Sequence, residues 1–358
     1  MPCALLLAVM LGACSKPAPA PPTDPPKAEK TAPAAKAAHA PTPKEALGEQ
    51  KAVAAADKAI GAEQIVGDYR IGLGFKVPRP LYLPGAGSRM EDQPGKGADA
   101  YMIVTVREVR TKRHLPRAGV SANVPRGEFE VPALPLLEVW DDFAHYAANV
   151  PLVKVGQEFQ ITLKVSPPVY GRHGDCIALW DKPATAKFIV KRGGGRLEVV
   201  GDPAGPADAG WMVGGDVADA LEETRQLVDA GQYTVGWVVE GPEPVWRWDK
   251  GKPIPEPIPD QATNHLEVVL LEKATGRMVT GAGVTLTLTP AAAGEHPIQF
   301  PLLPLMSEFH HYGATVAIPP GTYRVGIRIV RPTFTTLRAD RLSRTLSLTL
   351  PEPWIRKP

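Results

Sequence analysis

Histidines near a carboxylate and a methionine are the residues of this chain whose types and spacing could do chemistry. His265 and Glu267 lie two positions apart in a predicted strand, so an imidazole and a carboxylate project side by side from one face. Met306 precedes the adjacent pair His310 and His311, whose side chains point to opposite faces if the segment is extended. Imidazoles suit copper, iron and zinc, whereas a thioether favours Cu(I). Whether these groups act together depends on the elements that carry them.

Those elements belong to a tandem duplication. A shift of 164 residues aligns 67–82 with 231–246 and 101–120 with 265–284, and a shift of 166 aligns 135–150 with 301–316. In the last pair eight of sixteen positions are identical, against roughly one in fifteen expected by chance for ordinary compositions. We therefore predict two related units, repeat one at 59–205 and repeat two at 206–358.

The repeats differ most at their histidines. Repeat one has Tyr101 in place of His265, whereas its His145 aligns with His311. The alignment selects His311 as the inward-facing member of its pair, although a histidine at this shared position is also consistent with a structural role beneath the following tyrosine. Repeat one alone carries a late histidine, His173, because repeat two shortens that loop.

The pattern within each repeat is typical of β structure. Val, Ile, Thr and Tyr alternate or cluster in short segments, and 40 prolines and 34 glycines supply frequent turns. Short strands separated by such turns predict an all-β fold of two tandem immunoglobulin-like β-sandwich domains. One short helix is expected near residues 216–230, where Asp216 can cap its beginning and Gly231 can end it. The alignment allows a degenerate counterpart of this helix ahead of repeat one.

The first fourteen residues resemble a bacterial lipoprotein signal, with a short apolar stretch ending in Leu11-Gly12-Ala13-Cys14. The resemblance implies a signal peptide at 1–13, cleavage before Cys14 and a lipid on its sulfur; an ordinary secretory signal is the alternative. Residues 14–58 then comprise the lipidated cysteine and an Ala- and Pro-rich linker, which is expected to be disordered. No later stretch reaches the roughly 18 apolar residues of a membrane helix. The protein is therefore expected in the periplasm or cell envelope, lipid-anchored to a membrane.

Charge and motif content exclude several classes of function. The chain has 40 Lys and Arg against 38 Asp and Glu, so its formal charge of +2 provides no excess to release counterions from a phosphate backbone, and nucleic acid is not an expected partner. No phosphate loop, dinucleotide fingerprint or Ser/His/Asp order stands out, and we do not expect an enzyme. Cys176 has only His173 near it in the sequence, and a role as an additional metal ligand is a minor alternative.

Three motifs of the chain resemble those of the periplasmic ferrous-iron transport accessory family, whose members are small immunoglobulin-like sandwiches that bind copper, iron or zinc. The motifs are the strand Asn264-His265-Leu266-Glu267, Met306 with the turn His311-Tyr312-Gly313, and the late segment Arg172-His173-Gly174-Asp175 with Trp180. They span nearly the whole folded region but are divided between the repeats. The resemblance therefore concerns the chain as a pair of family-like domains.

Members of that family are homodimers with metal sites at the subunit interface, so the resemblance implies that the duplication forms an intrachain pseudo-dimer. The complete site that it implies consists of His265, Glu267, Met306 and His311 from repeat two and His173 from repeat one. Glu267 either binds the metal directly or orients an imidazole. The opposite site, with Tyr101, Trp140 and His145, lacks a late histidine and is expected to be inactive.

The sequence thus predicts an envelope lipoprotein that binds copper or iron, with zinc as a further option. The family resemblance implies that it is a non-catalytic accessory of ferrous-iron transport beside an inner-membrane iron permease. The main alternative is a metal-free envelope interaction or structural module with a degenerate site. A third hypothesis is a redox enzyme that uses bound copper, although no cysteine is placed as in electron-transfer copper sites.

Overall fold

The protein folds as two packed β-sandwiches, as the sequence predicts. The computed structural model describes residues 40, 42–85, 89–94, 97–125, 133–152, 157–205, 227–249, 251–292, 294–307 and 309–357. The predicted signal peptide, the lipidation site Cys14 and the linker up to residue 39 lie outside the described residues. In the part of the chain that the structure describes, no helix is both long and apolar enough to cross a membrane.

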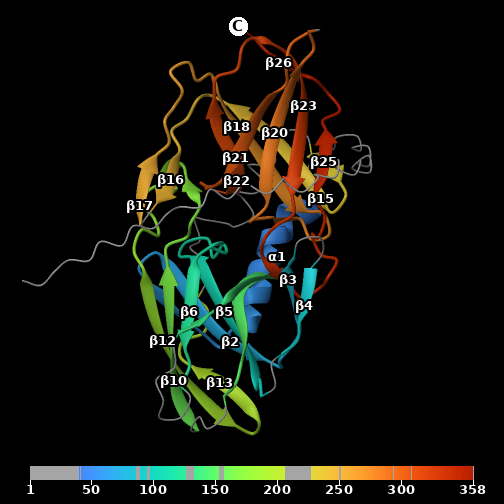
Figure 1. Ribbon diagram of the computed structural model, residues 1–358. Coiled ribbons are helices and arrows are strands. Elements are labelled where there is room, and N and C mark those ends of the chain that lie inside the picture. The colour runs from blue at the N-terminus through green and yellow to red at the C-terminus, as the bar shows by residue number, and fades with distance from the viewer. Residues whose placement is uncertain are drawn as a thin grey trace, which may run out of the picture. The chain divides into compact units, whose positions relative to one another are not determined.

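The first sandwich packs an eight-stranded sheet on a five-stranded one (Figure 1). In spatial order, seven strands of the larger sheet are β1 (Ala62–Val66), β2 (Tyr69–Lys76), β5 (Ala100–Glu108), β9 (Ala144–Val150), β8 (Leu137–Trp140), β3 (Leu81–Pro84) and β4 (Arg89–Asp92). The smaller sheet has the order β13 (Arg196–Val200), β12 (Ala184–Gly193), β10 (Glu158–Ser166), β6 (Gly119–Asn123) and β7 (Leu134–Pro135). Their facing side chains, such as Val104, Leu163 and Phe188, form one buried core.

The second sandwich repeats this architecture. One layer has the order β14 (Leu227–Ala230), β15 (Tyr233–Glu240), β18 (Asn264–Glu272), β22 (His310–Val316) and β21 (Ile298–Met306), followed across an inserted strand by β16 (Trp246–Asp249) and β17 (Lys252–Pro255). The other strands are β19 (Arg277–Met278), β20 (Gly283–Pro290), β23 (Gly321–Val330), β25 (Leu346–Thr349) and β26 (Trp354–Arg356). Tyr146 and Tyr312 show the correspondence: each hydroxyl donates to a backbone carbonyl, Leu115 or Val279, and accepts an amide N–H three residues further on.

The two repeats exchange a short strand. β11 (Gly171–Arg172) of repeat one enters the sheet of repeat two, where it runs parallel to β21 and antiparallel to β16. β24 (Thr335–Thr336) of repeat two enters the sheet of repeat one in the same way, between β8 and β3. The exchange places the loop that follows β11, including the short 3-10 helix η1 (Gly174–Cys176), against strands of the other repeat.

The helix content differs from the prediction. Residues 227–230 are not helical but form β14, which pairs with β15 through a turn at Gly231, whose φ of +58° suits glycine. The same Gly231 that we read as a helix terminator therefore closes a hairpin; residues 216–226 lie outside the described residues. The helix that the structure describes is α1 (Pro43–Ala59), so the linker prediction for 43–58 is wrong.

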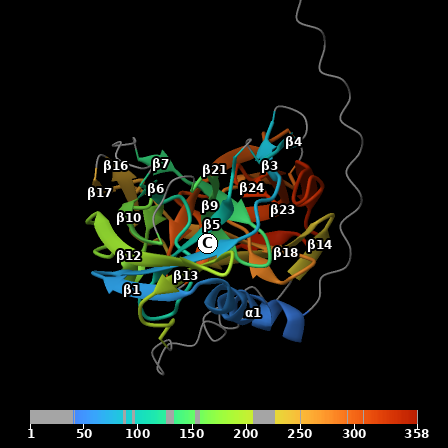
Figure 2. The same cartoon turned by 90° about the horizontal axis from the view of Figure 1, so that it is seen from below.

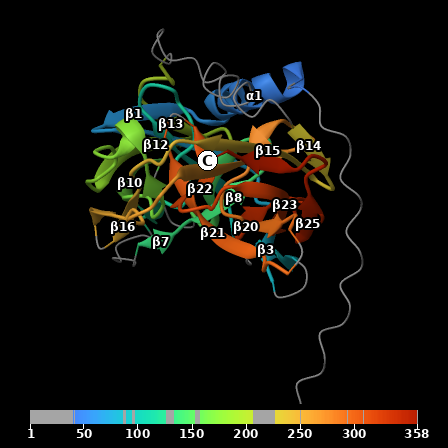
Figure 3. The same ribbon diagram turned by 90° about the horizontal axis from the view of Figure 1, so that it is seen from above.

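Packing and capping explain α1. A proline opens the first turn, and the Glu45 carboxylate accepts the Thr42 backbone N–H at 2.7 Å, both of which favour a helix start. Ala52 and Ala56 bury their small side chains in an apolar cluster with Tyr101. The helix packs against β9 of repeat one and β19 of repeat two, and Figures 2 and 3 show it on the outside of the molecule. An alanine-rich segment that looks like a linker in composition thus becomes a helix because both repeats offer it a surface.

Candidate metal centre

Three buried side chains of repeat two converge on the face of the sheet that is turned away from the repeat-two core. β18 and β22 are antiparallel neighbours with Glu267 opposite Gly313, so His265, Glu267 and His311 share one face. Glu267 Oε1 lies 3.4 Å from His265 Nε2 and 3.2 Å from His311 Nε2. One ligand atom from each residue falls within 4.8 Å of the others, the arrangement of a metal-binding group.

These groups are buried, and several of their polar atoms have no hydrogen-bond partner. His265 and His311 are 0% exposed and Glu267 is 3% exposed. No hydrogen bond reaches His265 Nε2, His311 Nε2 or Glu267 Oε2. A buried polar atom without a partner costs about 1–3 kcal/mol. Two ligand atoms that bind one metal ion at about 2.0–2.2 Å lie up to about 4.4 Å apart. The distances of 3.4 and 3.2 Å from Glu267 Oε1 to the two imidazole nitrogens are within that limit, so a bound ion would give these atoms a partner.

The hydrogen bonds around His265 fix which of its nitrogens has a lone pair. The Thr315 hydroxyl donates to the Glu243 carbonyl oxygen at 2.5 Å, so its oxygen is left to accept from His265 Nδ1 at 2.9 Å. Nδ1 therefore carries a proton, and the ring turns its other nitrogen, Nε2, toward Glu267. The ring nitrogen that a metal ion would use therefore points at the carboxylate.

The electrostatics of the group favour a cation. Burial alone would raise the pKa of Glu267, but His311, His265 and His173 outweigh burial and hold the pKa below its ordinary value. Burial lowers the pKa of His311 to about 4, although Glu267 opposes this shift. At neutral pH the site therefore combines an ionised carboxylate with a neutral imidazole, which are the protonation states that bind metal ions.

Strand exchange brings His173 of repeat one to the group. Its backbone N–H donates to the Met306 carbonyl at 3.0 Å, which continues the pairing of β11 with β21. Its ring stacks on His265, with centroids 5.3 Å apart and an interplanar angle of 3°, and meets His311 edge-on at 6.0 Å. His173 is partly exposed, and its Nε2 contacts the carboxylate of Glu243. The structure thus brings His173 of repeat one against the rings of His265 and His311, beside the close group of His265, Glu267 and His311.

Gly313 provides the space for this arrangement. A Cβ at this position would lie 2.7 Å from His265 Nε2 and 2.9 Å from Leu305 Cδ1. Real Cβ atoms essentially never come closer than 3.0 Å to another atom. Repeat one has Ala147 at the equivalent place, opposite Ile103. The glycine of the histidine-tyrosine-glycine turn is thus the residue that admits the imidazole of the neighbouring strand.

Met306 is not part of the group. It pairs with His310 across the β21–β22 hairpin, while Leu305 pairs with His311, so Met306 lies on the opposite face of the sheet from His311. Its side chain is 2% exposed and packs in the core of repeat one. The prediction that Met306 is a ligand is therefore wrong. The register of the β21–β22 hairpin places its side chain on the face of His310, not on the face of His311.

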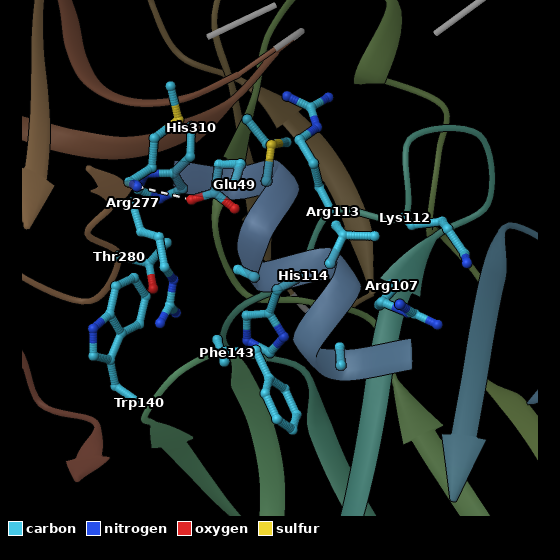
Figure 4. Close-up of a pocket in the computed structure, with 16 residues that line it drawn as sticks. Glu49, Arg107, Lys112, Arg113, His114, Trp140, Phe143, Arg277, Thr280 and His310 are labelled. Carbon is cyan, nitrogen blue, oxygen red and sulfur yellow. Dashed lines mark hydrogen bonds between the residues drawn. The ribbon is translucent and has the colours of Figure 1, made fainter. Parts of the chain in front are cut away.

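His310 and Met306 line a separate cavity of about 50 Å³ under α1. Figure 4 shows Glu49 and His310 at one end of it and Arg107 and Lys112 on the opposite side. Its charged lining residues are Glu49, Arg107, Lys112, Arg113 and Arg277. Because cations outnumber the single carboxylate, this cavity is a poor place for a metal ion, and the histidine-carboxylate group on the other face is the metal centre that the structure favours.

The equivalent place in repeat one is closed. Tyr101 and His145 hydrogen-bond to each other, with the hydroxyl 2.9 Å from Nε2, and His145 Nδ1 lies 3.1 Å from the Phe143 carbonyl. Leu337, which follows the exchanged strand β24 as His173 follows β11, packs on the same cluster with Ile103. Burial lowers the pKa of His145 to about 3. Both ring nitrogens are used internally, and no carboxylate replaces Glu267.

Two residues near the site escaped the sequence analysis. Thr315 fixes the His265 ring, and Glu243 contacts His173 from the loop between β15 and β16. The sequence could have indicated Glu243, because the repeat alignment pairs it with Arg79 and the two residues carry opposite charges. Thr315 had none, since its role depends on which residue faces His265 across the sheet.

Cys176 and Arg172 serve packing. The Cys176 thiol is 4% exposed, donates to the Ser307 carbonyl at 3.0 Å, and has its pKa raised to about 11 by burial. Arg172 is fully buried; it donates to the Trp180 carbonyl at 3.1 Å and lies 3.7 Å from the Trp248 ring. These contacts anchor the loop that carries His173.

No protein-family model and no curated protein matches this chain. Among solved structures, a copper-bound variant of FetP from uropathogenic Escherichia coli is similar at 19% sequence identity, with a TM-score of 0.25. The match covers 35% of this chain and 91% of that one. The assignment of the metal centre therefore rests on its own geometry.

Proposed function

We propose that this protein binds one transition-metal ion per chain at a composite site made by His265, Glu267 and His311 of repeat two and His173 of repeat one. The observation that carries the proposal is the buried group of His265, Glu267 and His311, whose ligand atoms lie within 4.8 Å of one another and which leaves His265 Nε2, His311 Nε2 and Glu267 Oε2 without a hydrogen bond. Copper, iron and zinc are the metals that imidazole ligands suit.

The cellular role that we propose is a non-catalytic accessory of ferrous-iron transport. The resemblance of the three motifs to the periplasmic accessory family supports it, and so does the division of those motifs between two repeats that exchange strands. In this proposal a lipid on Cys14 anchors the protein in the cell envelope, and the folded repeats present metal to an inner-membrane permease.

A metal-free interaction module is the second candidate, and repeat one gives it support. There the Tyr101 and His145 side chains satisfy each other and the rest of the face is apolar. Repeat one thus shows that the fold is stable when protein side chains, and no metal ion, occupy this place. The second candidate requires that His265 and His311 of repeat two be structural as well.

Anaerobic titration of the purified full chain in detergent, with Cu⁺, Cu²⁺, Fe²⁺ and Zn²⁺ in turn, tests the proposal. We expect one site per chain. His265→Ala and His173→Ala should each weaken binding by at least about 100-fold, because loss of even a residue that supports a ligand costs 10–100-fold. His145→Ala is the matched control and should leave affinity unchanged. The metal proposal is wrong if the wild-type chain binds metal no more tightly than surface histidines do, or if all three substitutions have equal effects. Either result would favour the metal-free interaction module.

A further inference from the structure

We infer that Glu243 is a further metal-binding side chain and that it makes the site selective for divalent cations over Cu(I). The inference rests on the proposed metal-binding function and concerns the same site. It follows from the placement of Glu243, the charge of the donor set, the kind of donor atoms, and a comparison between the repeats.

Glu243 sits on the solvent side of the site. Its carboxylate contacts His173 Nε2, and its backbone carbonyl accepts the Thr315 hydroxyl that also holds His265. The loop backbone is thus fixed by the same threonine that orients a ligand. The Glu243 side chain is 34% exposed and that of His173 is 14% exposed, whereas those of His265 and His311 are fully buried. Glu243 and His173 therefore form the outer layer of the site, where an arriving ion first meets protein.

Counting charges favours a divalent ion. A metal ion binds imidazole as a neutral ligand and carboxylate as an anion, so Glu267 and Glu243 together bring two negative charges and a divalent cation makes the occupied site neutral. Cu(I) would leave one negative charge uncompensated beside the buried imidazoles. An uncompensated charge in a buried place is costly, because water cannot solvate it.

The kinds of donor atom at the site also favour a divalent ion over Cu(I). Within the described residues the site offers three imidazoles and two carboxylates. Met306 lies on the other face of the sheet, and the Cys176 thiol is held by the Ser307 carbonyl. Cu(I) is selected by thiolate and thioether sulfur, whereas imidazole and carboxylate donors suit divalent first-row metals. The loss of Met306 from the site removes the one donor that the sequence offered to Cu(I).

Repeat one supplies an internal comparison. The residue aligned with Glu243 is Arg79, whose guanidinium lies 5.2 Å from the ring centroid of Tyr101, the counterpart of His265. The repeat that lost its imidazole and its carboxylate thus has a cation where the complete site has an anion. A structural loop contact would not require the sign of this charge to follow the presence of the metal ligands.

The test is Glu243→Gln in the full chain, titrated anaerobically with Zn²⁺, Fe²⁺ and Cu⁺ against competing chelators. Glutamine keeps the shape of the side chain and an acceptor oxygen for His173 but removes the charge. We expect the affinity for Zn²⁺ and Fe²⁺ to fall at least tenfold and that for Cu⁺ to stay within threefold of wild type. Arg79→Gln is the matched control and should change neither. X-ray absorption of the zinc-loaded protein should show nitrogen and oxygen without sulfur, with one oxygen fewer in the variant.

The outcomes separate this inference from the proposed function. Unchanged Zn²⁺ affinity in Glu243→Gln, or a sulfur ligand in the zinc-loaded protein, overturns the inference and leaves metal binding intact. An equal loss of Zn²⁺ and Cu⁺ affinity also overturns it, because Glu243 would then only position His173. A wild-type chain that binds none of the three metals refutes the proposed function itself.

Discussion

Gly313→Ala is the smallest change that should disable the proposed metal centre. The added methyl group would lie 2.7 Å from His265 Nε2, where ordinary contact begins at 3.4 Å. The imidazole or the strand must therefore move by about 0.7 Å, the difference between the two distances. Leu305 Cδ1, at 2.9 Å, blocks the alternative of shifting the methyl group the other way.

The size of the effect follows from that displacement. Overpacking a buried position by one methyl group destabilises a protein by about 1–3 kcal/mol. Binding constellations tolerate errors of about 0.5 Å, so a shift of this size should take His265 Nε2 out of reach of an ion shared with Glu267 and His311. We expect metal affinity to fall at least tenfold, which corresponds to about 1.4 kcal/mol of binding free energy.

Two measurements on one sample separate the site from the fold. Denaturant unfolding of the metal-free protein gives the loss of stability, and a chelator-competition titration gives the affinity of the folded fraction. Ala147→Gly, the reverse change at the equivalent place in repeat one, should leave affinity unchanged. If Gly313→Ala binds metal within threefold of wild type while remaining folded, His265 Nε2 does not hold the ion and the assignment of the site is wrong.

Further predictions concern stability in the metal-free protein. Burial holds the pKa of His145 and His310 at about 3 and that of His311 at about 4, below the ordinary 6.5, so the unfolded chain binds protons first as pH falls. Below pH 6.5 the free energy of unfolding should therefore fall by about 1.4 kcal/mol per pH unit for each histidine, until the folded protein takes up protons at pH 3–4. Denaturant unfolding from pH 7.5 to 4.5 measures this slope, and a flat profile would contradict the prediction. The His145→Gln variant should show a slope smaller by about one third. Arg341→Met removes the bidentate partner of buried Glu272, at 2.6 and 2.7 Å, and should lower the unfolding free energy at pH 7 by about 3–5 kcal/mol without affecting metal affinity; a loss under 1 kcal/mol would show that Glu272 has other sufficient partners.

The fold could be predicted from local pattern because each strand carries its own signal. The segment of His265 and Glu267 is a strand, and its alternating faces put both residues on one side as expected. Residues 227–230 show the limit of this reasoning. Leu227 and Val228 followed by Gly231 fit a helix end and a hairpin equally well, and pairing with β15 decides between them. That partner begins at Tyr233, just beyond the segment whose pattern suggests a helix.

The site was predictable to the extent that it depends on strand parity and on comparing the repeats. His311 is on the side that its alignment with His145 selects, and His310 is on the other. The position of Met306 could not be predicted, because the face of the sheet to which it belongs depends on the length and register of a hairpin turn. For residues 43–58 the alanine-rich composition predicts a linker, whereas the alignment allows a helix ahead of repeat one, and the structure has the helix α1 there. An alanine-rich segment has too little apolar surface to predict burial, yet Ala52 and Ala56 are buried against repeat one.

The strand exchange bears on why the proposed metal site occurs in one repeat and not in both. β11 and β24 each carry the following residue into the other repeat, so each site depends on both halves: His173 completes the site of repeat two, and Leu337 occupies the equivalent place in repeat one. Because the two late residues are now separate positions in one gene, they can change independently, which is not possible in a homodimer. In repeat one the equivalent place is an apolar cluster that includes Ala52 and Ala56 of α1. That cluster packs α1 and repeat one together, whereas the equivalent place of repeat two gathers His265, Glu267 and His311.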